Sequence, residues 1–353
     1  MPIISRVHHQ CRRLGDLLYL GLGLGLTFAA CQPQRDQSAT VEIPPMGHYE
    51  GGIVVTEQPE LRASLDIRHP SPGHYEAELT VPMASTLSFV ADTISFINNQ
   101  LRLTRPARPG QTLVLTLDGD FWRGTLKLDS TKAPTLLVKR GAPTPSTYHV
   151  EQIPQVSGSA WLFAPSDTDT PGAALALLPT TETMPAAALW ADALAREGII
   201  VLVLPAADSA TAATEAPRLQ AALGLLRGTA GADTANVGVW ATGTRAATMA
   251  QVIAGVSSPR VAYFIAQNAG IDVAGRTAFR ELRRHKVPVL SLYGGTTSAQ
   301  GAAARRNALG GRRSSAVRNY RTAGLDLLIP GGRIPRFGPG LPGDVVEWLR
   351  GQR

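Results

Sequence analysis

The chain has 353 residues, a formal net charge of +7 at pH 7 and only two cysteines. This length predicts two domains, and a hydrophobic content of 44% is enough to give each of them a core. Cys11 falls in a segment that we expect to be removed, so the remaining chain has no pair of thiols, which excludes disulfides, cysteine nucleophiles and cysteine metal sites.

Residues 1–30 have the pattern of a secretory signal peptide. Arg6, Arg12 and Arg13 give it a positive beginning, and its uncharged stretch is shorter than the roughly 20 apolar residues that span a bilayer. Small residues directly precede Cys31, and this arrangement resembles a bacterial lipoprotein signal, whose cysteine is acylated and becomes the new N-terminus. The alternative is an ordinary cleaved signal followed by a cysteine that is there by chance.

The segment 31–46 is polar at its start and contains Pro, Gln and Ser, so we expect a lipidated, flexible tether. Acidic residues do not cluster in it, and nothing in it indicates display on the outer face of a cell. The resemblance implies an exported protein that is anchored to a bacterial membrane through lipid on Cys31 and faces the periplasm. The lipid bilayer is then its expected partner.

Residues 47–141 predict a small all-β barrel or sandwich. Apolar and polar residues alternate over short runs such as 61–67 and 113–117, which is typical of half-buried strands. Turn-forming pairs such as Asp118-Gly119 separate the runs. The next segment, 142–157, contains three prolines and is expected to be a linker.

In residues 158–353, apolar runs alternate with helical patterns. Continuous apolar strands of this kind are typical of a parallel sheet that is covered on both faces. The predicted fold class is therefore α/β, with a doubly wound, mostly parallel sheet preceded by the small all-β domain. The expected strands are 173–178, 199–204, 237–241, 261–265, 287–292 and 325–329, and the expected helices are 185–197, 216–226, 246–256, 299–309 and 343–350.

The segment 237–247 carries a resemblance to a known family. Its strand, tight turn and alanine-rich helix resemble the nucleophile elbow of α/β-hydrolases, in particular of bacterial esterase-like hydrolases with a β-rich N-terminal domain. The elbow of that family reads Gly-x-Ser-x-Gly, and here Ala241, Gly243 and Arg245 stand at the fixed positions. Glycine adopts the left-handed backbone of the elbow without strain, so Gly243 would keep the turn but supply no attacking oxygen.

The other catalytic positions of the family are altered as well. The resemblance places the aspartate position at or near Thr297 and the histidine position at Leu327, and neither side chain ionises. No histidine follows His285, whereas a serine hydrolase of this type needs its base after the last strand. The resemblance therefore implies a catalytic triad that is degenerate at Gly243, Thr297 and Leu327.

Three functions remain open. The first is a non-catalytic envelope lipoprotein that binds a small acyl compound, a glycan or an envelope protein in a pocket at the strand ends, lined by Thr242, Thr244 and Arg245. The second is an active carboxylic-ester hydrolase with Thr242 or Thr244 as nucleophile and Asp326 as base. The third is a purely structural, lipid-anchored spacer.

No cofactor, metal or nucleic acid is expected. The second half has no pair of histidines at metal-ligand spacing, and no glycine-rich nucleotide fingerprint stands between a strand and a helix. Arginines gather near the C-terminus without interleaved aromatic residues, which favours a solvated surface over one for an anionic lipid, polymer or single-stranded nucleic acid. These arginines are Arg305, Arg306, Arg312, Arg313, Arg318 and Arg321.

Overall fold

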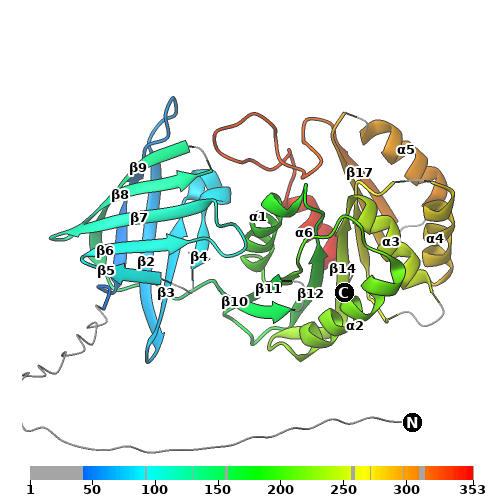
Figure 1. Cartoon of the computed structure of the whole chain (residues 1–353), viewed down its shortest axis with the longest axis horizontal. Helices are drawn as coiled ribbons and strands as arrows, with labels where there is room; N and C mark the ends of the chain where they lie inside the picture. The colour runs from blue at the N-terminus through cyan, green and yellow to red at the C-terminus, as the bar shows by residue number, and fades with distance from the viewer. Residues whose placement is uncertain are drawn as a thin grey trace, which may run out of the picture. The chain divides into compact units, whose positions relative to one another are not determined.

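The computed structural model describes residues 43–91, 94–129, 131–155, 158–255, 259–270, 272–296, 298–309 and 315–352. The predicted signal peptide, Cys31 and Thr297 lie outside these residues. The chain from Val41 onward forms one compact unit, which contains two β-sheets (Figure 1). Among the described residues there is no helix with the length and apolar character that a membrane span requires.

The first sheet is antiparallel and nearly closed, with nine strands in the order β4-β3-β2-β1-β9-β8-β7-β6-β5. Its strands follow one another along the chain within the range 47–141. They are β1 (Gly47–Ile53), β2 (Leu61–Ser71), β3 (His74–Thr80), β4 (Phe89–Ala91), β5 (Ile94–Ile97), β6 (Gln100–Thr104), β7 (Gln111–Asp118), β8 (Phe121–Leu128) and β9 (Thr131–Gly141), with a 3₁₀ turn, η1 (Pro82–Leu87), between β3 and β4.

Side chains that alternate along the strands build the core of this sheet. Leu65 and Ile67 on β2 are fully buried, as is Trp122 on β8. Two strands come unusually close at Gly51, because a Cβ added there would lie 2.0 Å from the carbonyl oxygen of Leu136. Only glycine permits that approach.

The second sheet has eight strands in the order β10-β11-β13-β12-β14-β15-β16-β17. Strands β12 to β17 run parallel, while β10 and β11 form an antiparallel edge. Helices α2, α3 and α4 cover one face, α1 and α6 cover the other, and α5 packs on β16 and β17. The elements are β10 (Tyr148–Gln155), β11 (Gly158–Pro165), β12 (Gly172–Leu178), α1 (Met184–Ala195), β13 (Ile200–Val203), α2 (Ala212–Gly228), β14 (Ala232–Thr242), α3 (Gly243–Ala254), β15 (Phe264–Gln267), α4 (Val273–Arg284), β16 (Val289–Gly294), α5 (Ser298–Leu309), β17 (Ser315–Tyr320) and α6 (Gly343–Arg350).

Two helices of this sheet begin at residues that cap them. The Thr211 hydroxyl accepts the N–H of Thr214 at the start of α2, and the Asp272 carboxylate accepts the N–H of Gly275 at the start of α4. These helices follow β13 and β15, so their first turns come after the carboxyl ends of parallel strands. Such edges are where sheets of this kind carry their sites.

The predicted fold class is wrong for the chain as a whole. Strands hold 41% of the described residues and helices 26%, and the largest sheet is the antiparallel one, so the described protein is mostly β rather than a doubly wound parallel α/β protein. The predicted class rested on the alternation of strands and helices in the second half. The strand content of the whole chain is higher than that alternation suggests, because β2 and β9 have 11 residues each and the second sheet has an antiparallel edge.

Two predicted elements differ from the structure. Within the expected linker, residues 148–155 form the edge strand β10, where Pro154 is tolerated because an edge strand leaves N–H groups unpaired. The apolar run 325–329 is a turn rather than the last strand, with Leu327 in the left-handed region at φ +66°. The last strand is β17, whose residues are mostly half-buried and therefore give no apolar run.

One of the arginines expected on a solvated surface is buried. Arg305 on α5 is 0% exposed, its guanidinium lies against the ring of Phe279, and its Nε donates to the hydroxyl of Tyr293 at 3.2 Å. Arg306 is exposed. The arginine-rich region is thus not a uniform solvated surface.

Candidate functional site

The turn from β14 into α3 lies at the centre of the second sheet. Gly243 is the first residue of α3 and has φ +56°, a backbone conformation that favours glycine. A Cβ added there would lie 3.2 Å from Cγ2 of Thr180. Strand β14 therefore ends in a sharp turn at Gly243, which carries no side chain beyond a hydrogen atom.

Three buried threonines fill the space around this turn. The Thr242 hydroxyl lies 2.7 Å from the hydroxyl of Thr183 and accepts the backbone N–H of Thr180 at 2.9 Å. The same N–H of Thr180 also lies 3.0 Å from the Thr183 hydroxyl. Thr242 is 2% exposed, and its hydrogen bonds go to two hydroxyls and a backbone amide rather than to a base. The cluster satisfies polar groups of the loop after β12.

Arg245 is held by an ion pair and hydrogen bonds inside the fold. Its guanidinium is 1% exposed and binds the Glu215 carboxylate with both Nε and Nη2, at 3.0 and 2.9 Å. Its Nη1 donates to the carbonyl oxygens of Pro179 and Pro205 at 3.1 and 2.9 Å. Burial lowers the pKa of Arg245, and the neighbouring Glu215 opposes that shift. The arginine thus ties the starts of α2 and α3 to the loops after β12 and β13.

The remaining pocket candidate, Thr244, is exposed. Cavities of about 600, 560 and 530 Å³ occur elsewhere in the described part of the chain. Of the three pocket candidates, only Arg245 lines one of these cavities, the one beside α2. The structure therefore does not gather Thr242, Thr244 and Arg245 around a common cavity among these three.

A buried leucine, Leu327, stands at the expected histidine position. Leu327 is fully buried and belongs to the same core cluster as Trp190 and Trp240. The carbonyl oxygen of Leu325, two residues earlier, accepts hydrogen bonds from the side chains of Gln267 and Asn268, both at 2.6 Å. The turn that should present a base is therefore bound to the end of β15.

The segment after this turn reaches the other sheet. Ile334 is 2% exposed and is part of the core of the nine-stranded sheet. On either side of it, the Thr86 hydroxyl donates to the carbonyl oxygen of Pro335, and Arg333 pairs with Glu57 at 3.1 Å. Segment 321–342, which follows β17, is thus anchored in both halves, by Leu327 in one and by Ile334 in the other.

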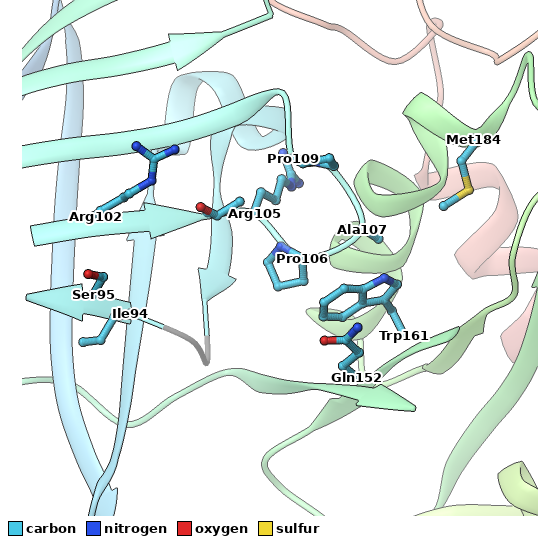
Figure 2. A pocket seen from close by; sticks show the side chains of 11 residues that line it. Ile94, Ser95, Arg102, Arg105, Pro106, Ala107, Pro109, Gln152, Trp161 and Met184 are labelled. Atoms are coloured by element: carbon cyan, nitrogen blue, oxygen red, sulfur yellow. The ribbon is translucent and has the colours of Figure 1, made fainter. Parts of the chain in front are cut away.

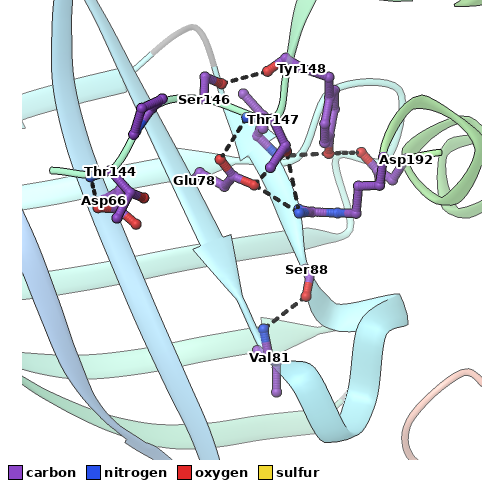
Figure 3. A network of polar contacts seen from close by, with 12 residues as sticks. Asp66, Glu78, Val81, Ser88, Thr144, Ser146, Thr147, Tyr148 and Asp192 are labelled. Carbon is purple, nitrogen blue, oxygen red and sulfur yellow. Dashed lines mark hydrogen bonds and ion pairs between the residues drawn. The ribbon is translucent and has the colours of Figure 1, made fainter. Parts of the chain in front are cut away.

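A second polar cluster joins the two sheets (Figure 3). Arg105 and Asp192 form a buried ion pair, and the Tyr148 hydroxyl donates to the same carboxylate while accepting the N–H of Val90 at 3.0 Å. Burial raises the pKa of Tyr148 well above its usual value and the adjacent Asp192 raises it further, so the hydroxyl keeps its proton. A lone carboxylate in the apolar helix α1 is the sequence signal that could have revealed this cluster.

The contact between the two sheets, called the seam below, contains a second ion pair. Arg196 donates to Glu78 at 2.8 Å, and the Thr147 hydroxyl donates to that carboxylate at the same distance. Figure 3 shows Glu78 and Thr147 meeting beside Tyr148. These ion pairs stabilise the contact between the sheets. Their charged groups are bonded to one another and are therefore not available as catalytic groups.

The described histidines form no hydrogen bond with Thr242 or Thr244 at the turn. His48 bonds to Asp66 and Glu50 in the first sheet, and His285 caps the C-terminus of α4. Burial alone would lower the pKa of His48, but the two carboxylates raise it above its usual value. Within the described residues, no three His, Cys, Asp or Glu side chains form a group that could hold a metal ion.

Comparisons with known proteins give only distant similarities. No family model matches the chain, and no curated protein matches it. Among solved structures, a protein described as a dienelactone hydrolase from Klebsiella pneumoniae is 14% identical, with a TM-score of 0.42 over 58% of this chain and 99% of its own. A dienelactone hydrolase from Anabaena variabilis is 16% identical, with a TM-score of 0.43 and the same coverage. Similarity at this level assigns neither an activity nor a substrate to this chain.

Proposed function

We propose that this chain is a lipid-anchored envelope protein whose hydrolase-like half binds and does not hydrolyse. The observation that carries the proposal is the end of β14. The backbone there turns sharply at Gly243, which has no hydroxyl, and the neighbouring Thr242 hydroxyl is bonded to Thr180 and Thr183. Acyl transfer needs a nucleophile in contact with a proton acceptor, and this arrangement offers neither.

The alternative, an ester hydrolase that uses threonine, has no geometric support. Thr242 is buried within its hydroxyl cluster, and the exposed Thr244 hydroxyl bonds to no acid or imidazole among the described residues. The Asp326 carboxylate accepts the N–H of Leu328 at 3.0 Å, and this bond stabilises the turn that contains both residues. A threonine hydroxyl without a base is a poor nucleophile.

Hydrolysis of p-nitrophenyl acetate and butyrate by the purified chain tests the proposal. We expect no turnover above that of Thr242→Val and Thr244→Ala, the two variants that remove the candidate hydroxyls. We also expect no gain in Gly243→Ser, because Leu327 leaves a restored serine without an imidazole. Turnover that disappears in either threonine variant would show that the chain is an enzyme.

The proposed anchor rests on the sequence alone, on the short apolar segment and the small residues before Cys31. It predicts that the chain, expressed in a bacterium, fractionates with membranes and incorporates a radiolabelled fatty acid. Cys31→Ser should abolish both properties. A chain that remains with the membranes and carries label after this substitution would refute anchoring through Cys31.

A further inference from the structure

One of these cavities lies at the seam between the two sheets (Figure 2). Its volume is about 600 Å³, within the ~300–1,000 Å³ range of small-molecule sites. Residues of β5, β6 and the turn after β6 form one side, and residues of β10, β11 and α1 form the other. Thr242, Gly243 and Thr244 do not line it.

Apolar groups make up much of the wall. Ile94, Pro106 and Ala107 come from the nine-stranded sheet, and Trp161 and Met184 from the other half. Trp161 and Met184 are both half-buried, and a methionine side chain adapts its shape to what it contacts. Figure 2 shows the indole of Trp161 near Pro106 and Ala107. These walls favour a ligand with an apolar body.

The charge of the lining is positive. Arg105 is neutralised by Asp192, but Arg102 is exposed and forms no hydrogen bond or ion pair with another described residue. Arg102 pairs directly with Ser95 across β5 and β6, so the guanidinium-bearing side chain and the hydroxyl project from the same face of the sheet. Among the described residues that line the cavity there is no carboxylate. A free guanidinium beside apolar walls is complementary to an anion.

We propose that this seam cavity binds an amphipathic monoanion, an apolar chain or ring that carries one carboxylate. Trp161 and Met184 contact the apolar part, and Arg102 binds the carboxylate with the paired donors of its guanidinium. The proposal deepens the binding function given above and rests on it. It also moves the ligand from the strand ends to the contact between the sheets.

Isothermal titration of the purified chain with decanoate tests this assignment. We expect saturable binding of one equivalent, weakened at least tenfold in Arg102→Gln and in Trp161→Ala. Decan-1-ol, which has the same chain without the charge, should bind with an affinity that Arg102→Gln leaves unchanged. Arg123→Gln is the matched control, because Arg123 is an exposed arginine of the same sheet outside the cavity, and it should leave decanoate binding unchanged.

Failure to bind decanoate would overturn the assignment, as would binding that Arg102→Gln and Trp161→Ala both leave intact. An equal loss in Arg123→Gln would also overturn it, because that result would mean general attraction to positive charge. These outcomes are separate from ester turnover. If the chain binds no decanoate and hydrolyses no ester, the ligand assigned to the cavity is refuted and the non-catalytic proposal remains in place.

Discussion

At the scale of single residues, the backbone of Gly243 explains how an elbow-like turn persists without a nucleophile. The turn requires a left-handed residue, and a side chain there would crowd Thr180. Glycine meets both requirements, and it places no hydroxyl group at this position.

The first prediction concerns this backbone position. Gly243→Ala should lower the free energy of unfolding by about 1–2 kcal/mol, the cost of a left-handed conformation for a residue with a Cβ. Denaturant titration measures the change. The control is Gly224→Ala within α2, where an added Cβ meets nothing within 4 Å and should stabilise the helix by ~0.5–1 kcal/mol. A gain of stability at both positions would contradict the strained turn.

The second prediction concerns the buried ion pair. Arg245→Met removes the bidentate partner of Glu215, which is 0% exposed, and should cost about 3–5 kcal/mol of unfolding free energy because a buried carboxylate loses its main partner. Arg284→Met, in the exposed pair with Glu281, should cost less than about 1 kcal/mol. Equal effects in urea titrations would mean that Arg245 has no special structural role.

Sequence reasoning could place Gly243 but not the role of Arg245. A glycine at the end of an apolar strand and the start of an alanine-rich helix is a local signal. The partner of Arg245 is 30 residues away, and nothing local shows that the two side chains meet. The sequence therefore predicts a pocket position for Arg245 but not the ion pair that neutralises its charge inside the fold.

At the scale of elements, the segment between β17 and α6 is anchored in the cores of both halves. Leu327 enters the core of the second half and Ile334 enters the core of the nine-stranded sheet. A segment fixed in two cores has little freedom to present a base to the end of β14.

The third prediction tests that attachment. Ile334→Ala should lower the free energy of unfolding by about 2–5 kcal/mol, as for other large-to-small changes in a core. Ile329→Ala lies in the same segment, but its side chain is 37% exposed, so its cost should be well below that of Ile334→Ala. Chemical denaturation of both variants gives the comparison, and similar losses would show that Ile334 does not enter a core.

The elements that sequence reasoning missed are those without a periodic pattern. β10 contains a proline and β17 is mostly half-buried, so neither gives an apolar run. Residues 325–329 do give one, yet a left-handed turn at Leu327 makes that run a loop. Periodicity identified the first sheet because its strands alternate, which is the clearest signal a strand can give.

At the scale of the whole molecule, the seam makes the two sheets one structure. The buried pair of Arg105 and Asp192 and the bond between Tyr148 and Val90 both cross between the two halves. The sequence predicted separate domains joined by a linker. It could not show this contact, because the partners lie 87 residues apart for the ion pair and 58 for the bond between Val90 and Tyr148.

The fourth prediction follows from the seam. Calorimetry should record one unfolding transition for the chain, because the halves share buried charges and therefore unfold together. Arg105→Met should lower the transition temperature strongly, since it leaves Asp192 buried without its cation. Arg123→Met, in an exposed pair with Asp118, should change it little. Two separate transitions in the unmodified chain would contradict the account of the seam.

The central claim is that the end of β14 holds no activated nucleophile. The most direct measurement is the intact mass of the purified chain after exposure to an alkyl fluorophosphonate, which attaches irreversibly to activated hydroxyl groups. The geometry at Gly243 and Thr242 predicts an unchanged mass. One added phosphonyl group per chain, located by peptide mapping on Thr242 or Thr244, would contradict the claim and identify an active hydrolase.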